Sequence, residues 1–526
     1  MLRRLTTYVA RAIGLCALAL GLPTVYSASD SGHQTVATTQ PDWPPPVFEP
    51  LTGVCSSALS GSGKTYNVGP GQVHEELTQV PWLSLREGDV VNIFHRAAPY
   101  RTKIGLRAQG SPAAPVVING VTDAQCNRPE ISGQNAVTAA DAAREKFFSK
   151  QHSENLGLFF IYQAPGDKWG YRPAYITIQN LKLTGAHKSN TYIAQDGTTA
   201  AYNLGAAGIY AVRVEGLRVE NNEITGNGNG VFVNSREDGD FSEYIVIRRN
   251  RIHANGNVGS YTEHNLYIQA KRPLYEGNYI GQLIPGARGS SLKDRSSATV
   301  IRYNHIDAAA RAIDLVEIEG GVAPVRNDPL YHQAWVYGNL IVSDHDSPAR
   351  ASTLLIHWGG DNDARYFRSG PLHFFHNTVV TRSSKAQAYY LCVFDMPGDA
   401  QSVHANANVF AHQGSSILSL GYKGGKIVLN DVNWVTSGWV KGWGPGVAFE
   451  RSGATVLEGQ DPRLDASYVP LTDSPLGDKG ASGARAALTS AGAVAPALTH
   501  QYAMTASIKV RSMKGAALDV GAFEMN

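Results

Sequence analysis

The chain has 526 residues, of which 43% are hydrophobic and 17% are charged, and its 46 Lys and Arg against 44 Asp and Glu leave a net charge of +2. Because the positive and negative charges are nearly equal in number, the composition gives no reason to expect nucleic acid or an anionic membrane as a partner. After the first segment, no stretch is long and apolar enough to predict a membrane span.

The first 27 residues have the order of a secretory signal peptide. Three arginines within the first 11 residues precede an apolar run over 12–22, and small residues follow up to Ser27, where we place the cleavage. The apolar run is too short to serve as a permanent anchor. The sequence therefore predicts an exported protein, either periplasmic or extracellular.

Residues 28–50 are rich in Ser, Thr, Gln and Pro and cannot bury enough apolar surface to fold alone, so we interpret them as a tether. Short β-type runs separated by Gly and Pro follow from Leu51. An Ala-rich stretch from about Ala139 to Lys150 predicts a helix.

Three cysteines remain after Ser27, an odd number in a compartment that permits disulfides. Cys55 and Cys126 are the better-placed pair because both lie in the N-terminal section. Cys392 lies in an apolar run and is interpreted as a buried free thiol. An interpretation with three unpaired thiols is about equally good on sequence alone.

A short motif recurs seven times: an Asn, then any one residue, then an aliphatic or aromatic residue. Its members are Asn222, Asn250, Asn278, Asn304, Asn339, Asn377 and Asn408, with steps of 28, 28, 26, 35, 38 and 31 residues. Such spacing is typical of coils of three short strands with insertions in their loops. Asn tolerates the turn between strands, and stacked Asn amides would bond as a ladder.

The sequence thus predicts an all-β fold, a right-handed parallel β-helix. Residues 51–160 form its N-terminal cap with a short helix and the first coils, 161–460 form the main β-helix, and 461–526 form a closing segment, because an open coil end would expose apolar surface. A β-sandwich or a propeller also uses short strands, but propeller blades need about 40–50 residues per unit.

Two groups of short sequence segments near the chain ends resemble the first and last segments of secreted bacterial right-handed β-helix proteins. The closing phrases are 461–464, 469–475, 477–480 and 517–524, and the opening phrases are 85–91 and 115–120. With the Asn repeats the resemblance spans roughly residues 64–526. It implies the fold more narrowly than the function.

Alternate residues of a β-helix strand point inward and outward, so outward residues of successive coils form ladders. Aligning the strand after each Asn directs Val231, Leu266, Leu292 and Ile313 inward. The outward ladder then consists of Phe232, Tyr267, Lys293 and Asp314, with Asn234, Gln269 and Arg295 on a neighbouring ladder, flanked by Arg236, His264 and Asn265.

This patch suits an anionic sugar chain, because aromatic faces take sugar rings and Arg grips a uronate carboxylate bidentately. Cleavage by β-elimination needs that carboxylate neutralised and a base beside the adjacent carbon. We predict Lys293 as the base, because Arg295 would favour its neutral amine, and Tyr267 or His264 as acid or alternative base. Predicted substrate-binding residues are Phe232, Asn234, Arg236, Asn265, Gln269, Asp314, His357 and Trp358.

The patch loosely resembles that of parallel β-helix polysaccharide lyases of the chondroitinase B and alginate lyase group, in which Lys and Arg are the catalytic pair. In that group the pair lies on different coils beside a calcium site, whereas Lys293 and Arg295 share one strand. The resemblance implies Ca²⁺ as the one cofactor to test, with Glu263, Asp294 and Glu317 as weak oxygen-ligand candidates.

Each feature also has a purely structural interpretation. Lys293, Asp294 and Arg295 would serve equally well as a charged strand that pairs across coils, and Phe232 and Tyr267 as a stack that stabilises them. His357 and Trp358, with Asp361, form a second sugar-facing cluster on a long insertion or simply an ordered loop.

Three functions follow from these residues. The first is a monomeric polysaccharide lyase on a uronate-containing glycan. The second is a glycoside hydrolase that takes its two carboxylates from Asp294, Asp314 and Glu317. The third is a non-catalytic protein that binds glycans or has a structural role at a surface.

Overall fold

The computed structural model describes residues 55–149, 153–168, 170–348, 352–385, 390–444, 446–480, 498–503 and 506–525. All of them belong to one compact unit, Thr38–Asn526. The predicted signal peptide and tether lie outside the described residues. Within them, no helix is both long and apolar enough to cross a membrane.

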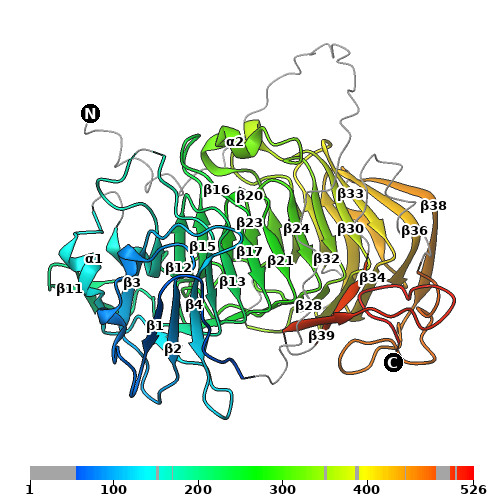
Figure 1. Cartoon of the computed structure of the whole chain (residues 1–526). Helices are drawn as coiled ribbons and strands as arrows, with labels where there is room; N and C mark the ends of the chain where they lie inside the picture. Colours follow the sequence, from blue (N-terminus) through cyan, green and yellow to red (C-terminus); the bar gives the residue numbers. More distant parts are fainter. Residues whose placement is uncertain are drawn as a thin grey trace. The chain divides into compact units, whose positions relative to one another are not determined.

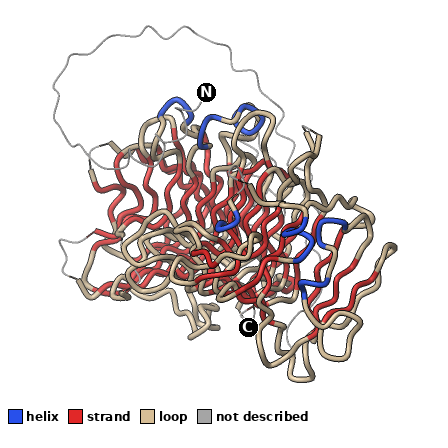
Figure 2. Tube along the Cα trace, turned by 90° about the vertical axis from the view of Figure 1, so that its left-hand side faces the viewer, coloured by secondary structure: helices blue, strands red, loops and turns tan. Residues whose placement is uncertain are grey.

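The unit is a right-handed parallel β-helix, in which each coil contributes strands to three stacked faces (Figures 1 and 2). The first face contains β1 (Thr65–Val68), β2 (Val90–Phe94), β4 (Val116–Val121), β8 (Ile176–Gln179), β13 (Arg218–Glu220), β17 (Val246–Arg248), β21 (Leu274–Glu276), β24 (Thr299–Arg302), β27 (Ala334–Tyr337), β30 (Gly370–Phe375), β33 (Gln401–Asn406), β36 (Lys426–Thr436) and β38 (Ala448–Gly459). The second contains β5 (Glu130–Ser132), β9 (Lys182–Thr184), β14 (Glu223–Thr225), β18 (Arg251–His253), β22 (Tyr279–Ile280), β25 (His305–Asp307), β28 (Leu340–Asp344), β31 (Thr378–Ser383) and β34 (Val409–Gly414), and the later parts of β36 and β38 complete it.

The third face contains β3 (Thr102–Leu106), β7 (Gly157–Ile161), β12 (Ala207–Val212), β15 (Asn229–Asn234), β19 (Leu266–Ile268), β23 (Leu292–Asp294), β26 (Ile313–Leu315), β29 (Leu354–Trp358), β32 (Tyr390–Met396), β35 (Ile417–Lys423) and β37 (Val440–Trp443). At its start it is extended by β6 (Ala136–Thr138), β10 (Thr191–Ile193) and β11 (Thr199–Ala201). Two separate pairs are β16 (Ser242–Glu243) with β20 (Ala270–Lys271) and β39 (His500–Ala503) with β40 (Ser507–Val510).

Helices are few and short among the described residues. The predicted helix over 139–150 is a single turn, α1 (Ala140–Arg144), and α2 (Ala323–Arg326) follows a loop after β26. The 3-10 turns are Leu77–Gln79, Trp82–Ser84, Glu154–Leu156, Glu319–Gly321 and Ala364–Tyr366. Coils pair in parallel already from β1 and β2, so the β-helix begins well before residue 161.

Parallel pairing between successive coils rules out the propeller and sandwich alternatives, whose strands are antiparallel. The inward side chains stack into a buried core, of which Val231, Leu266, Leu292 and Ile313 are all 0% exposed. This burial confirms the inward half of the predicted alternation. Stacking of branched aliphatic side chains in register supplies the apolar burial that stabilises the coils.

The predicted Asn ladder is present and runs one rung further, to Asn433. From Asn222 onward each Asn Nδ2 donates to the Oδ1 of the next Asn, at 2.9–3.2 Å. The reason given for the Asn in the turn is wrong, however. The left-handed residue is the one before it, such as Arg249 (φ 55°) or Tyr303 (φ 56°). Asn is required there for its amide, which bonds to the coils on both sides.

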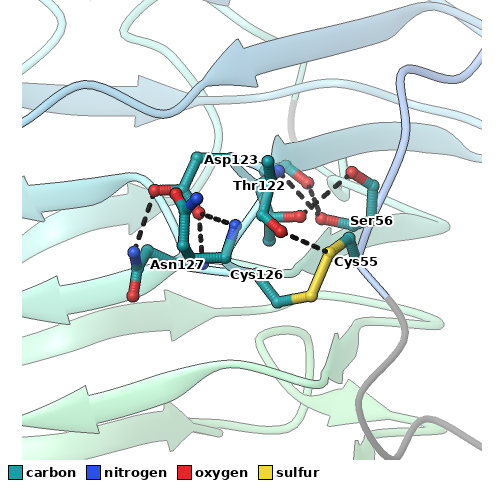
Figure 3. Close-up of a disulfide and its surroundings, with 9 residues drawn as sticks. Cys55, Ser56, Thr122, Asp123, Cys126 and Asn127 are labelled. Atoms are coloured by element: carbon teal, nitrogen blue, oxygen red, sulfur yellow. Dashed lines mark hydrogen bonds between the residues drawn. A yellow bond between two sulfur atoms is a disulfide. The ribbon is translucent and has the colours of Figure 1, made fainter.

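A disulfide joins Cys55 to Cys126 and fixes the start of the described chain to the loop after β4 (Figure 3). Cys392 is buried and free, as the sequence indicated. At the other end, the C-terminal segment packs alongside the coils: Gly521 N donates to Ala407 O at 2.8 Å, and Ala522 N to Thr378 Oγ1 at 3.0 Å.

Lys103 makes the stability of the first coils depend on pH. It is 0% exposed, donates to Gly157 O at 2.6 Å, and lies 4.2 and 4.4 Å from the ring centroids of Tyr192 and Tyr202. Burial lowers its pKa to about 7. Because the unfolded chain binds this proton up to about pH 10.5, the unfolded state holds more protons between these two values.

The free energy of unfolding should therefore rise with pH from 7 to about 9.5, by up to about 1.4 kcal/mol per unit from this group. Urea denaturation at several pH values measures this slope, and Lys103→Met should flatten it. Equal slopes in the two proteins would contradict the assignment to Lys103.

Candidate functional site

The outward residues of the third face form one continuous ladder. Strand pairing places Phe232 beside Tyr267, Tyr267 beside Lys293, and Lys293 beside Asp314. The register predicted from the sequence is therefore confirmed. The ladder continues through His357 to Asp395, so the second cluster proposed from the sequence belongs to the same face.

The aromatic half of the ladder is a closed stack. Tyr210, Phe232 and Tyr267 follow one another with centroids 4.7 Å apart and planes tilted by only 10° and 15°. Each ring face is thus covered by the next ring. Phe232 cannot offer its face to a sugar as predicted, and the structural interpretation of this stack is the correct one.

Lys293 lies at the start of the charged half and bridges two carboxylates. Its Nζ donates to Asp314 Oδ2 at 2.8 Å and to Asp361 Oδ2 at 2.9 Å. From the sequence we expect the cationic neighbour Arg295 to favour the neutral amine. The contacts are instead those of an ammonium held by two anions, which has no lone pair to accept a proton.

The loop that brings Asp361 to Lys293 is held by Glu317. Both carboxylate oxygens of Glu317 are used on backbone N–H groups: Oε2 accepts from Asp361 at 2.9 Å, and Oε1 from Asn362 and Asp363 at 2.8 and 2.9 Å. Arg295 Nη1 donates to Glu317 O at 2.7 Å, and its Nη2 to Asp361 Oδ1 at 3.2 Å. Glu317 is therefore an anchor for this loop.

Asp314 and His357 form a hydrogen-bonded pair. Burial by itself would raise the pKa of Asp314, but Lys293, His357 and Arg311 together hold it well below its ordinary value. An ionised carboxylate only accepts, so His357 Nδ1, 3.0 Å from Asp314 Oδ1, carries the proton. In the neutral ring Nε2 then has the lone pair. It has no hydrogen-bond partner in the described part of the chain and lies 4.0 Å from Asp395.

Two further predicted residues have defined protonation. Burial lowers the pKa of His264 to about 3, and its Nδ1 accepts the backbone N–H of Ser290 at 2.8 Å. Its Nε2 is consequently a donor, which excludes His264 as a base. Burial raises the pKa of Tyr267, whose hydroxyl donates to Glu319 Oε2 at 3.0 Å. Tyr267 therefore remains a protonated phenol.

A pocket of about 420 Å³ opens over Lys293 and Asp314. Cationic side chains from three positions line it, Arg288, Lys293 and Arg311, together with His264 and Asp361. Further lining residues are Tyr261, Ser290, Ala310 and Ser352. This volume is within the range of about 300–1,000 Å³ that ligand sites occupy.

Several predicted substrate-binding residues do not face this pocket. Trp358 points into the core, 0% exposed, and donates to Gly370 O at 3.0 Å. Asn265 donates to Gly281 O at 2.7 Å as part of a turn, and Gln269 bonds to Ser235 O and accepts from Glu319 N. Backbone groups satisfy the polar atoms of Trp358 and Gln269, and Asn265 Oδ1 accepts from Asn255 Nδ2 at 2.9 Å, so none of these three side chains lines this pocket.

Asn234 and Arg236 lie beside the aromatic stack, away from the cation-lined pocket. Asn234 ends β15, and its carbonyl accepts from Ser242 Oγ at 2.9 Å. The Arg236 guanidinium lies 5.6 Å from the centroid of Tyr162. Neither is among the side chains that line the pocket.

The residues proposed for Ca²⁺ do not fit the ion. Asp294 is 0% exposed inside the β-helix and accepts from Tyr275 at 2.8 Å, Thr299 at 2.7 Å and Arg368 at 3.3 Å. Glu317 is committed to its loop, and Glu263 accepts from Thr262. Among the described residues no group of three or more His, Cys, Asp or Glu side chains could hold a metal.

Arg288, Arg311 and Asp395 were missed by the sequence analysis. Arg311 Nη2 donates to Asp395 Oδ2 at 2.7 Å, and its Nη1 lies 3.6 Å from Asp314 Oδ1. Extending the strand alignment by two coils would have found Asp395. Arg288 and Arg311 come from connecting loops of unequal length, where no periodic signal exists.

The protein is thus a parallel β-helix with a buried row of ion pairs beneath a cation-lined pocket. No protein-family model and no curated protein matches its sequence. Similar solved structures include an alginate lyase from Paenibacillus sp. str. FPU-7, with 13% identity, a TM-score of 0.37, and coverage of 71% of this chain and 94% of that one. Pectate lyase Pel9A has 10% identity, a TM-score of 0.32, and coverage of 89% and 98%.

A lacto-N-biosidase of family GH136 from Eubacterium ramulus has 11% identity and a TM-score of 0.36, with coverage of 75% of this chain and 68% of that one. These TM-scores are too low to support an assignment of function.

Proposed function

We propose that this chain is an exported carbohydrate-active protein that binds an acidic polysaccharide on its third face and cleaves it by β-elimination. The observation that supports this most is the pocket of about 420 Å³, into which Arg288, Lys293 and Arg311 converge above an Asp–His pair. The Cys55–Cys126 disulfide supports export, since such bonds persist in oxidising compartments.

In this proposal Lys293 and neighbouring guanidinium groups neutralise a uronate carboxylate of the substrate, which makes the proton on the adjacent carbon acidic. Lys293 acts as a cation, in place of the base role expected from the sequence. His357 accepts the proton through Nε2, as its Nδ1 is bonded to Asp314. Arg311 bridges the carboxylates on either side of His357, and this step requires it to shift toward the substrate so that the substrate reaches the buried Nε2.

The elimination then breaks the glycosidic bond on the next carbon and leaves a double bond in the sugar. The leaving oxygen takes its proton from water, because Tyr267 lies three rungs from His357 on the ladder and does not line the pocket. A hydrolase is less well supported, because its general acid needs a raised pKa. Asp314 and Asp361 both have lowered pKa values: burial opposes the shift, but nearby cations outweigh it.

The experiment is incubation with a panel of polyuronates and neutral polysaccharides. Elimination predicts a rise in ultraviolet absorbance from the unsaturated product with one or more polyuronates. A rise in reducing ends without absorbance would identify a hydrolase. Binding without either product would leave a glycan-binding protein.

A further inference from the structure

The carboxylate of Asp361 lies where an incoming carboxylate would have to bind. Its Oδ2 accepts from Lys293 Nζ at 2.9 Å and its Oδ1 from Arg295 Nη2 at 3.2 Å, so that one group bridges two cations. A carboxylate with each oxygen on a different cationic donor is a strong, charge-assisted arrangement. Both cations come from β23 and the residue after it, whereas Asp361 comes from the loop after β29.

We propose that Lys293 and Arg295 form the subsite for the uronate carboxylate, and that Asp361 is an internal occupant that the substrate's carboxylate replaces. This inference rests on the proposed function, because it names where the acidic group of that substrate binds. Arg295 is only 3% exposed, yet its Nε has no hydrogen-bond partner among the described residues. Asp361 bonds to Nη2 of this guanidinium, so the Nε donor is left for another acceptor.

The exchange requires movement of one side chain only. Glu317 holds the backbone N–H of Asp361 and of the two residues that follow, so the loop stays in place while the Asp361 side chain rotates. That side chain is 26% exposed and lines the same pocket as Lys293. One carboxylate leaves as another enters, so neither buried cation is left uncompensated.

Asp361→Asn tests this proposal, because it removes the competing charge and keeps the shape. Asp363→Asn is the matched control, since Asp363 belongs to the same loop but pairs with Arg365. Isothermal titration with sodium D-glucuronate should show at least tenfold tighter binding to Asp361→Asn than to the unsubstituted protein. Asp363→Asn should bind like the unsubstituted protein, and D-glucose should show no gain.

The gain should vanish in the double variant Lys293→Met with Asp361→Asn. Unchanged affinity in Asp361→Asn, a gain that survives in the double variant, or an equal gain for sodium sulfate would each overturn the subsite. Binding is read without turnover, so the two proposals fail separately. Tighter glucuronate binding by Asp361→Asn, with no cleavage of any polyuronate, would contradict the lyase activity and support the subsite. Cleavage of a polyuronate, with no tighter binding by Asp361→Asn, would support the lyase activity and contradict the subsite.

Discussion

Replacing Lys293 by alanine is expected to lower polyuronate cleavage by about 10²–10³-fold, the usual effect of removing one group that stabilises developing charge. The variant loses the ammonium that the structure holds between Asp314 and Asp361. Lys293→Arg keeps the positive charge and should retain a measurable part of the activity. Steady-state rates of the two variants measure the difference.

The arginine variant separates the two roles of Lys293. If Lys293 were the base, Lys293→Arg would be as inactive as Lys293→Ala, because a guanidinium does not lose its proton near neutral pH. Lys188→Ala, at an exposed position, controls for the loss of a lysine in general. Thermal unfolding of all three variants shows whether the fold survives.

Asn278→Ala is expected to destabilise the β-helix by about 3–5 kcal/mol, since several buried polar groups would lose their partners at once. Asn278 Oδ1 accepts from the backbone N–H and Nδ2 of Asn250, at 2.9 and 3.0 Å, and its Nδ2 donates to Ile247 O at 2.8 Å. All of these groups are buried. Chemical denaturation measures the loss.

Asn203→Ala is the matched control for the ladder. Asn203 is exposed, and its Oδ1 accepts only a local bond from Gly205 N at 3.0 Å. Its replacement should cost less than about 1 kcal/mol. Similar losses at the two positions would mean that the ladder contributes no more than an ordinary turn.

The fold followed from two periodicities in the sequence. The Asn steps indicate the coil length and strict alternation indicates the register, and together they place Phe232, Tyr267, Lys293 and Asp314 on one ladder. Both signals are local and recur in each coil, so an error in placing one coil does not carry over to the next. Asp294 and Trp358 are the sequence neighbours of outward residues and point inward, so the same alternation, applied to them, would have argued against both as site candidates.

The pocket could not be predicted in the same way. Asp361, Arg288 and Arg311 lie in connecting loops, whose length varies from coil to coil and whose path depends on tertiary contacts such as the Glu317 anchor. The protonation states of Lys293 and His264 could not be predicted from the sequence either. Only the contacts show that Lys293 is bound by two carboxylates and that His264 accepts a backbone N–H.

Binding of an acidic sugar in the pocket over Lys293 and Asp314 can be observed directly. The most direct measurement is a crystal structure of His357→Ala, expected to be slow in turnover, with a short oligouronate. We expect a uronate in this pocket, with its carboxylate on the Lys293 ammonium. An oligouronate bound on the first or second face, with the Lys293 pocket empty, would contradict it.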